Sequence, residues 1–309
     1  IKFFIKNQVL FENFIKKLKI CILFNIIKEE KIMKVVKKRL RKDRVFLLVL
    51  LLFFSTIFIF SAFKVIEWLS DNNNTDKVIE KINNDVKVDE VKDNENTEVI
   101  DEEPTEPEKV SDYFYYITYP LINVDFESLL KTNNETVGWI NVNNTNINYP
   151  FVQGINNTYY LNHSFDKSYN SAGWVFMDYR NNKEMNNKNT ILYAHGRIDK
   201  TMFGSLYKTQ YPAWYQNRSN HIIRISTPSV NMSYQIFSVY KIEEESYYIQ
   251  TDFTSDDVYL EFLNTIKERS KYDFNVVLNE SDKIITLSTC ANDKERYVVH
   301  AKLIKKSER

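Results

Sequence analysis

Cysteine and glycine are both scarce in this sequence, with two cysteines and five glycines among 309 residues. No group of Cys and His residues has the spacing of metal ligands, and no glycine-rich phosphate-binding loop is present. We therefore expect neither a metal nor an organic cofactor. A net charge is lacking too, because 41 basic and 41 acidic residues cancel. Without an overall basic field, nothing favours a nucleic-acid partner.

What the sequence does contain is one long apolar run, Val45 to Phe63, which has nineteen residues and no charge. As a helix the run would be roughly 28 Å long, close to the ~30 Å hydrocarbon core of a bilayer. It therefore predicts a transmembrane helix. The alternative, a buried globular helix, is disfavoured because the run offers no polar face. A cleaved signal peptide is the other alternative, but Ser61-Ala62-Phe63 is a poor cleavage site.

The charges on the two sides of this run predict its orientation. Residues 33–44 contain seven Lys or Arg and one Asp, so this basic segment should be cytoplasmic, with everything after Lys64 outside the cell. The first methionine is Met33, and we expect residues 1–32 to be an upstream extension. An amphipathic cytoplasmic segment is the other interpretation of residues 1–32.

A highly acidic segment follows the apolar run. From Asp71 to Val110 there are fourteen acidic residues, five Lys and no aromatic residue, so we expect an extracellular stalk over residues 64–112, with transient helix at Val78–Val91. Residues 113–309 then form a single folded domain.

Short β-rich runs, separated by Asn, Gly and Asp, recur through residues 113–309 and suggest a barrel or a sandwich. The eight predicted strands are Gly138–Val142, Thr145–Val152, Gly173–Asp178, Thr190–His195, His221–Ile225, Tyr234–Ile242, Lys283–Cys290 and Arg296–Ile304. Helices are predicted at Phe126–Lys131 and at Ser255–Arg269, the second between the sixth and seventh strands and with a candidate N-cap at Thr254–Asp256.

The last two strands suggest chemistry. Five mostly polar residues separate Cys290 from Arg296, so antiparallel pairing would make the two neighbours. Cys290 cannot form a disulfide with Cys21, since the membrane segment separates them. A free thiol, with a pKa of about 8.5, is only about 3 % thiolate at pH 7, so it needs a nearby cation or imidazole to act as a nucleophile. A solvated strand charge is the alternative for Arg296.

A thiol nucleophile also needs a base, and the chain has four histidines. His195 ends an apolar strand, where loops build sites, and it is the preferred candidate. His163 lies in a loop rich in Tyr and Asn and is the alternative. His221 is the first residue of a predicted strand and His300 lies inside another, and we expect both histidines to be structural.

Several motifs together resemble the sortase family, and specifically its class B. These are Thr190-Ile-Leu-Tyr-Ala-His195-Gly, Thr201-Met-Phe-Gly-Ser-Leu206, Leu287-Ser-Thr-Cys290 and Arg296-Tyr-Val-Val-His-Ala-Lys-Leu303, with flanks such as Asn148-Tyr-Pro-Phe-Val-Gln153. The resemblance covers residues 113–304. It departs from the family at Ala194, where Gly is common, and at Ile198-Asp-Lys200, where a Gly often precedes Thr-Met-Phe.

The resemblance implies a mainly β fold: an eight-stranded β-barrel with an N-terminal helix and a helix inserted between strands 6 and 7, preceded by one transmembrane helix. It implies that Cys290 attacks a threonyl carbonyl in the C-terminal sorting signal of a surface protein, with Arg296 stabilising the oxyanion and His195 carrying the proton. An amine of a cell-wall peptide or a pilin lysine then releases the thioacyl enzyme. The resemblance assigns the groove for the signal to Asn157, Leu161, Ser288, Tyr247 and Tyr248.

Two other functions remain possible from the residues themselves. One is an extracellular cysteine peptidase, in which water releases the acyl enzyme. The other is a catalytically inactive surface-binding module, with its Tyr- and Asn-rich loops as the binding face. Thiol reactivity separates the inactive module from the enzymes, and products formed with and without an amine separate the transpeptidase from the peptidase.

Overall fold

The computed structural model describes residues 16–17, 42–101, 113–243, 245–289 and 295–309. The chain divides into two units, Ile1–Val65 and Ile66–Arg309. Most of residues 1–32, including Cys21, lies outside the described residues, and so does Cys290.

The apolar run forms part of helix α2, which spans Lys42–Asp85. Within the described residues, α2 is the one helix long and apolar enough to cross a membrane, by length and composition. The large apolar side chains between Val45 and Phe63 are exposed, as a helix surrounded by lipid requires. The helix thus indicates a single-pass membrane anchor.

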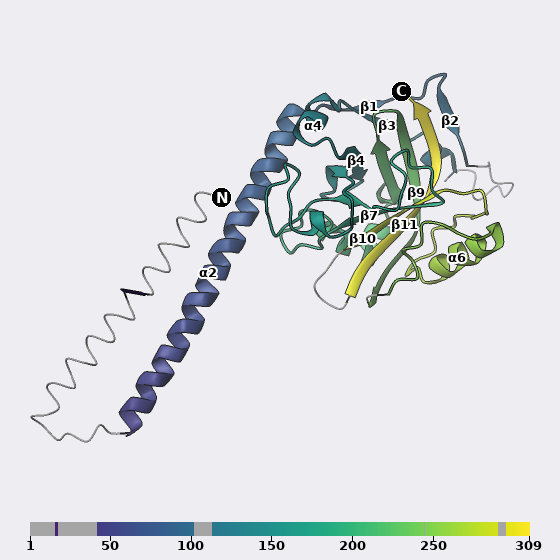
Figure 1. The fold of residues 1–309 in the computed structure, drawn as a ribbon. Helices are drawn as coiled ribbons and strands as arrows, with labels where there is room; N and C mark the ends of the chain where they lie inside the picture. Colours follow the sequence, from purple (N-terminus) through teal and green to yellow (C-terminus); the bar gives the residue numbers. More distant parts are fainter. Residues whose placement is uncertain (1–15, 18–41, 102–112, 244, 290–294) are drawn as a thin grey trace, which may run out of the picture. The chain divides into compact units, whose positions relative to one another are not determined.

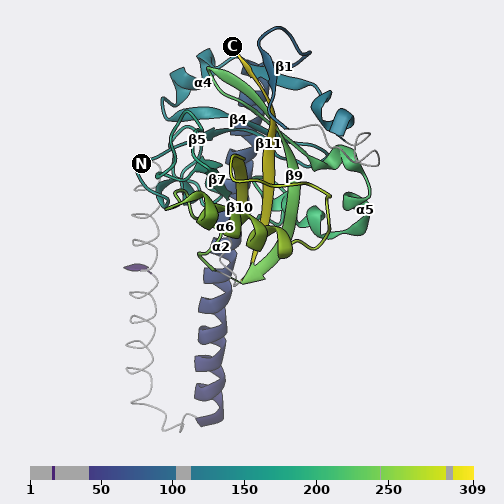
Figure 2. The ribbon, with the colours of Figure 1, turned by 90° about the vertical axis from the view of Figure 1, so that its right-hand side faces the viewer.

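The second unit contains a closed barrel of eight strands (Figures 1 and 2). The strands are β4 (Thr136–Val142), β5 (Asn148–Val152), β6 (Phe176–Met177), β7 (Asn189–Ala194), β8 (Ile222–Ser226), β9 (Val230–Glu243), β10 (Ile284–Thr289) and β11 (Glu295–Glu308). Their order is β10-β7-β6-β5-β4-β8-β9-β11, and pairing of β10 with β11 closes the ring. The pairs β5–β6 and β7–β10 are parallel and the others antiparallel. The predicted eight-stranded barrel is confirmed.

Every residue of β7 and of β10 is buried. Their inward side chains join the barrel core with Trp139, Phe151 and Phe237. The segment after β9 covers their outer side: the Asn189 side chain donates to the Gln250 carbonyl at 2.8 Å. Strands buried on both faces are usually near-continuous apolar runs, and polar residues in these two strands are hydrogen-bonded, as Thr286 is to the Asn189 side-chain oxygen at 2.7 Å.

Both predicted helices are present. Helix α4 is Glu127–Thr132, and α6 is Asp256–Glu268, which lies between β9 and β10. The Ser255 side chain caps α6 by accepting from the Val258 N–H. One face of α6 packs against the barrel and carries the buried side chains Tyr259, Phe262, Leu263 and Ile266. Short helical turns complete the unit: η1 (Tyr159–Leu161), η2 (Gly204–Gln210), α5 (Pro212–Tyr215) and η3 (Arg218–His221).

The acidic segment differs from the expected stalk. Strand β1 (Val88–Val91) pairs antiparallel with β3 (Leu121–Val124), and β2 (Thr97–Val99) adds to the outer edge of β11. Ile82 and Val86 are buried in the barrel's core cluster. Residues 66–101 are therefore part of the folded unit, which we expected to begin only at residue 113.

Electrostatics explains why this acidic segment packs against the barrel. Strand β11 buries Lys305 completely, and its Nζ lies 2.7 Å from an Asp93 carboxylate oxygen. Lys302 is also buried, with its Nζ 2.7 Å from Asp101. A buried charge is costly unless it is paired. The acidic segment provides the paired charges, so its composition reflects ion pairing with the barrel in addition to solvation.

Candidate active site

His195 follows directly after β7, at the carboxyl end of the strand. Its side chain is half-buried, and its Nε2 lies 2.7 Å from the carbonyl oxygen of Leu161. Because a carbonyl oxygen only accepts, Nε2 carries a proton and donates it. The backbone is held as well, since the Phe203 N–H donates to the His195 carbonyl at 3.0 Å. His195 is thus fixed by both its ring and its main chain.

The end of β10 lies beside His195. In the parallel ladder of β7 and β10, Ala194 pairs with Thr289. A Cβ atom added to Gly196 would lie 3.4 Å from the Cβ of Thr289, so the residues on both sides of His195 are close to Thr289. Cys290 is the next residue in the chain.

Arg296 reaches the same place from the other neighbour of β10. Ser288 pairs with Val298 in the antiparallel ladder of β10 and β11, and the Tyr297 N–H donates to the Thr289 hydroxyl at 3.0 Å. Arg296 precedes Tyr297, is half-buried, and donates from Nη1 to the Glu295 carbonyl at 3.4 Å. Thr289 therefore lies between the strand that leads to His195 and the strand that begins beside Arg296.

Two of the five predicted groove residues lie in the interior. Ser288 and Tyr248 are 2 % and 3 % exposed, and their hydroxyl oxygens are 3.0 Å apart. Side chains this buried offer little surface to a peptide. Their hydrogen bond instead attaches the segment after β9 to β10.

The other three groove residues are partly exposed. The Asn157 side-chain nitrogen donates to Asp178 at 2.9 Å, and its oxygen accepts from the Tyr179 N–H at 3.0 Å. Tyr247 donates to the Tyr240 hydroxyl at 3.0 Å. Of these three residues, Leu161 contacts His195, because the Leu161 carbonyl oxygen accepts a hydrogen bond from the imidazole.

Asp178 is a buried carboxylate near the site that we did not single out from the sequence. It is fully buried and accepts from the Tyr193 hydroxyl at 2.9 Å and from the Arg180 guanidinium at 2.7 Å. Burial alone would raise the pKa of Asp178, but the hydrogen bonds from Arg180 and Tyr193 outweigh it and lower the pKa. Its signal in the sequence was weak, because Asp178 ends a predicted strand, where acids are ordinary turn residues.

The remaining histidines have structural contacts. His163 stacks on Tyr159 with ring centroids 3.9 Å apart, and its Nδ1 lies 2.8 Å from the Tyr159 carbonyl. His221 is buried between the Tyr116 hydroxyl at 2.9 Å and the Tyr215 carbonyl at 2.8 Å. His300 is buried in β11, as expected of a structural histidine.

His300 belongs to a chain of buried polar groups under the site. Its Nε2 lies 2.8 Å from the Tyr240 hydroxyl and its Nδ1 2.8 Å from the Thr286 hydroxyl, which in turn donates to the Asn189 side-chain oxygen at 2.7 Å. Burial lowers the pKa of His300 to about 3. The imidazole is therefore neutral at physiological pH and can accept from Tyr240 while donating to Thr286.

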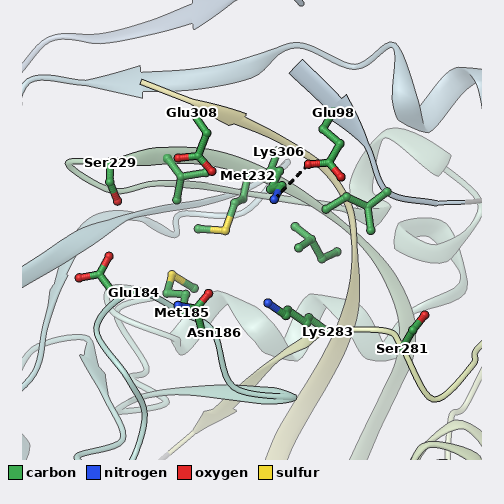
Figure 3. A pocket seen from close by; sticks show the side chains of 13 residues that line it. Glu98, Glu184, Met185, Asn186, Ser229, Met232, Ser281, Lys283, Lys306 and Glu308 are labelled. Atoms are coloured by element: carbon green, nitrogen blue, oxygen red, sulfur yellow. Dashed lines mark ion pairs between the residues drawn. The ribbon is translucent and has the colours of Figure 1, made fainter. Parts of the chain in front are cut away.

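A pocket of about 430 Å³ lies elsewhere, at the opposite end of β7 and β10 (Figure 3). Its lining includes Asn186 and Lys283, which precede these strands, whereas His195 follows β7. Lys306 in its wall forms an ion pair with Glu98 at 3.0 Å. The pocket is separate from the candidate active site.

Comparison with known proteins identifies the family to which this barrel belongs. The family model of the sortase domain matches residues 140–304. Over 190 residues the chain is 39 % identical to sortase B of Staphylococcus aureus (strain NCTC 8325 / PS 47), an alignment that covers 60 % of this chain and 77 % of that protein. It is 35 % identical to sortase B of Listeria monocytogenes, covering 59 % and 75 %.

Solved structures of sortase B are similar to this chain as well. The crystal structure of sortase B from Bacillus anthracis in complex with AAEK1 is 41 % identical, with a TM-score of 0.55, and the match covers 58 % of this chain and 84 % of that one. The substrate complex of Staphylococcus aureus sortase B gives 40 % identity, the same TM-score and the same coverage. The chain belongs to the sortase family. It is a homologue of sortase B and a cysteine transpeptidase.

Proposed function

We propose that the chain cleaves the C-terminal sorting signal of surface proteins through a thioacyl intermediate on Cys290 and transfers the protein to an amine acceptor. The observation that carries the proposal is the register of the two ladders of β10. The parallel ladder pairs Thr289, which precedes Cys290 in the sequence, with Ala194, which precedes His195. The antiparallel ladder pairs Ser288, two residues before Cys290 in the sequence, with Val298, two residues after Arg296.

In this arrangement each group has a role in the first half of the reaction. The Cys290 thiolate attacks the carbonyl carbon of the scissile peptide bond, and the Arg296 guanidinium stabilises the negative charge that develops on the carbonyl oxygen. The carbon–nitrogen bond then breaks, and the leaving amine takes a proton from His195. The Leu161 carbonyl accepts from Nε2, so this proton is carried by Nδ1.

The second half reverses these roles. An acceptor amine attacks the thioester carbonyl and loses its proton to His195, the carbon–sulfur bond breaks, and the Cys290 thiolate is regenerated with a new amide bond in the product. We propose a cell-wall peptide or a pilin lysine as the acceptor. One solved sortase B is complexed with triglycine and another with a substrate, which supports both kinds of partner for this chain.

The location follows from the charges around the anchor. We propose that residues 33–44 are cytoplasmic, that residues 45–63 span the membrane, and that the catalytic unit works outside the cell. There it meets signals that are still held in the membrane and acceptors that are being exported. The groove for the signal would include the exposed parts of Asn157, Leu161 and Tyr247. Ser288 and Tyr248 would support it from the interior.

Product analysis tests the proposal. The full-length protein in detergent micelles is incubated with peptides that carry candidate sorting motifs, with and without glycine peptides, diaminopimelate stem peptides or pilin lysine peptides, and the products are identified by mass spectrometry. We expect slow hydrolysis alone and an amide-linked product with the correct amine. Hydrolysis products alone, with every acceptor at millimolar concentration, would contradict transfer and support a peptidase.

A further inference from the structure

One turn of α2, Asp71 to Thr75, lies beyond the apolar run and packs against the barrel unit. Asp71 and Thr75 are 9 % and 1 % exposed, which is unusual for polar residues of a helix that continues into an anchor. Both residues form hydrogen bonds with the segment that follows η1. The burial of this turn therefore depends on specific polar contacts.

The first set of contacts joins Asp71 and Thr75 to residues 170 and 171, which lie close to Leu161, the hydrogen-bond partner of His195. The Asp71 carboxylate accepts from the backbone N–H of Ser171 at 3.1 Å and also from its hydroxyl. The buried side-chain nitrogen of Asn170 donates to the Asp71 carbonyl at 3.2 Å and to the Thr75 hydroxyl at 3.0 Å. This turn of α2 thus holds both residues 170 and 171.

Residues 170–174 in turn hold the segment around Leu161. The Asn170 N–H donates to the Asn162 carbonyl at 3.0 Å, and the Trp174 N–H donates to the Tyr160 carbonyl at 2.9 Å. Gly173 has φ +62°, and a Cβ at this position would lie 2.8 Å from the Leu161 carbonyl oxygen. Only glycine permits this close approach. The Leu161 carbonyl that accepts from His195 is thus fixed through residues bound to α2.

A second contact approaches His195 from the other side. Asn72 accepts a hydrogen bond from the guanidinium of Arg197, two residues after His195. Arg197 is also paired with Asp199 at 2.6 Å and donates to the Thr201 hydroxyl at 3.0 Å. The guanidinium therefore ties the loop after β7 to the helix. Asn72 and Asp71, which are adjacent in the chain, hold the two segments that position the imidazole.

We propose that Asp71 and Asn72 are positioning residues for His195, so that the membrane-proximal turn of α2 completes the active site. The inference rests on the proposed role of His195. Asp71 acts through Ser171 and the Leu161 carbonyl, and Asn72 acts through Arg197. The general acid must hold its orientation to within a fraction of an ångström through two proton transfers, and loosening of either support lowers the rate of the chemical steps.

The test uses the full-length chain in detergent micelles with a sorting-signal peptide. Asp71→Ala is expected to lower kcat roughly tenfold while KM stays within about twofold, because the support acts on His195 and makes no contact with the peptide. Asp71→Asn keeps an oxygen that accepts from the Ser171 N–H and should recover most of that loss. Asn74→Ala, an exposed position on the same turn, is the matched control and should behave as wild type.

A measurement independent of turnover separates this inference from the proposed function. In protein labelled with 15N-histidine, the Nε2 resonance of His195 should shift in Asp71→Ala and in Asn72→Ala and stay in place in Asn74→Ala. An unmoved resonance, with wild-type kcat, would overturn the inference even if the thermal midpoint falls. A shifted resonance, together with full activity of His195→Ala, would uphold the positioning contacts and refute the proton-transfer role. If Asp71→Ala does not fold, the same measurements are made on Asn72→Ala, because this change leaves the more buried contacts of Asp71 intact.

Discussion

The Nε2 of His195 lies 2.7 Å from the carbonyl oxygen of Leu161. Because a carbonyl oxygen only accepts, this contact requires Nε2 to be protonated, and the proposed mechanism therefore assigns proton exchange with the substrate to Nδ1. It also links two loops that are thirty-four residues apart in sequence, one after β7 and one at η1. The proposed base and the carbonyl that orients it therefore come from different parts of the barrel unit.

Replacement of His195 tests its role as the proton carrier. We expect His195→Ala to lower kcat/KM by about 10² to 10⁴, the usual contribution of general acid and base catalysis. Turnover of a signal peptide by the full-length protein measures it. His163→Ala is the matched control, because His163 stacks on Tyr159 and belongs to another loop. A greater loss in His163→Ala than in His195→Ala would reverse the assignment.

Replacement of Arg296 by Lys keeps the charge and removes the planar donor group. We expect Arg296→Lys to lower kcat by about 10² to 10³, as loss of an oxyanion donor does. The measurement is single-turnover acylation by the signal peptide. Arg218→Lys, a change on η3 where the guanidinium lies over the Tyr115 ring, should leave the rate unaltered. Equal rates in the Arg296 and Arg218 variants would show that Arg296 is a bystander.

The ion pairs of the acidic segment predict its contribution to stability. Asp93→Ala leaves the buried ammonium of Lys305 with the Tyr119 carbonyl at 2.8 Å as its remaining described partner, and should cost about 1 to 2 kcal/mol of unfolding free energy. Asp89→Ala removes an exposed pair with Lys87 and should cost about 0.5 kcal/mol or less. Chemical unfolding measures the loss of unfolding free energy in each of the two variants. Equal losses would mean that the segment contributes through its strands alone.

The burial of His300 predicts a pH dependence of stability. Its pKa is about 3 in the folded protein against 6.5 for the ordinary side chain, so as the pH falls below 6.5 the unfolded chain binds the proton first. The stabilisation is complete above pH 6.5 and is lost as the pH falls toward 3, by about 2 kcal/mol at pH 5. Thermal unfolding at pH 7 and pH 5 should show a larger fall in wild type than in His300→Gln. Equal falls in the thermal midpoint of wild type and His300→Gln would show that groups other than His300 cause the pH dependence.

Much of the barrel could be predicted from the sequence because its signals are local. The β-rich runs and the capped apolar face of α6 are each contained in a few neighbouring residues, and the structure confirms them. The strands β1 and β2 had no such signal. They are polar, and Asp93 in the loop between them binds Lys305, which is more than two hundred residues away in the sequence.

The candidate site also combines features that the sequence predicts with features that it does not. The order of His195, Cys290 and Arg296 follows from residue types and motifs, whereas the Leu161 contact uses a backbone carbonyl, which leaves no trace in side-chain identity. The family resemblance places Ser288 and Tyr248 in the groove, whereas in the structure both are buried and their hydroxyls are hydrogen-bonded to each other. A polar residue in a buried strand marks a hydrogen bond as readily as it marks a binding surface.

Intact mass spectrometry of the full-length protein tests most directly whether Cys290 carries the acyl group. After brief incubation with a signal peptide and no amine, we predict a mass increase equal to the acyl fragment, removed by hydroxylamine and absent in Cys290→Ala. Peptide mapping should place it on Cys290. An adduct of the same mass on Cys290→Ala, or turnover by that variant at the wild-type rate, would show that Cys290 does not carry the acyl group.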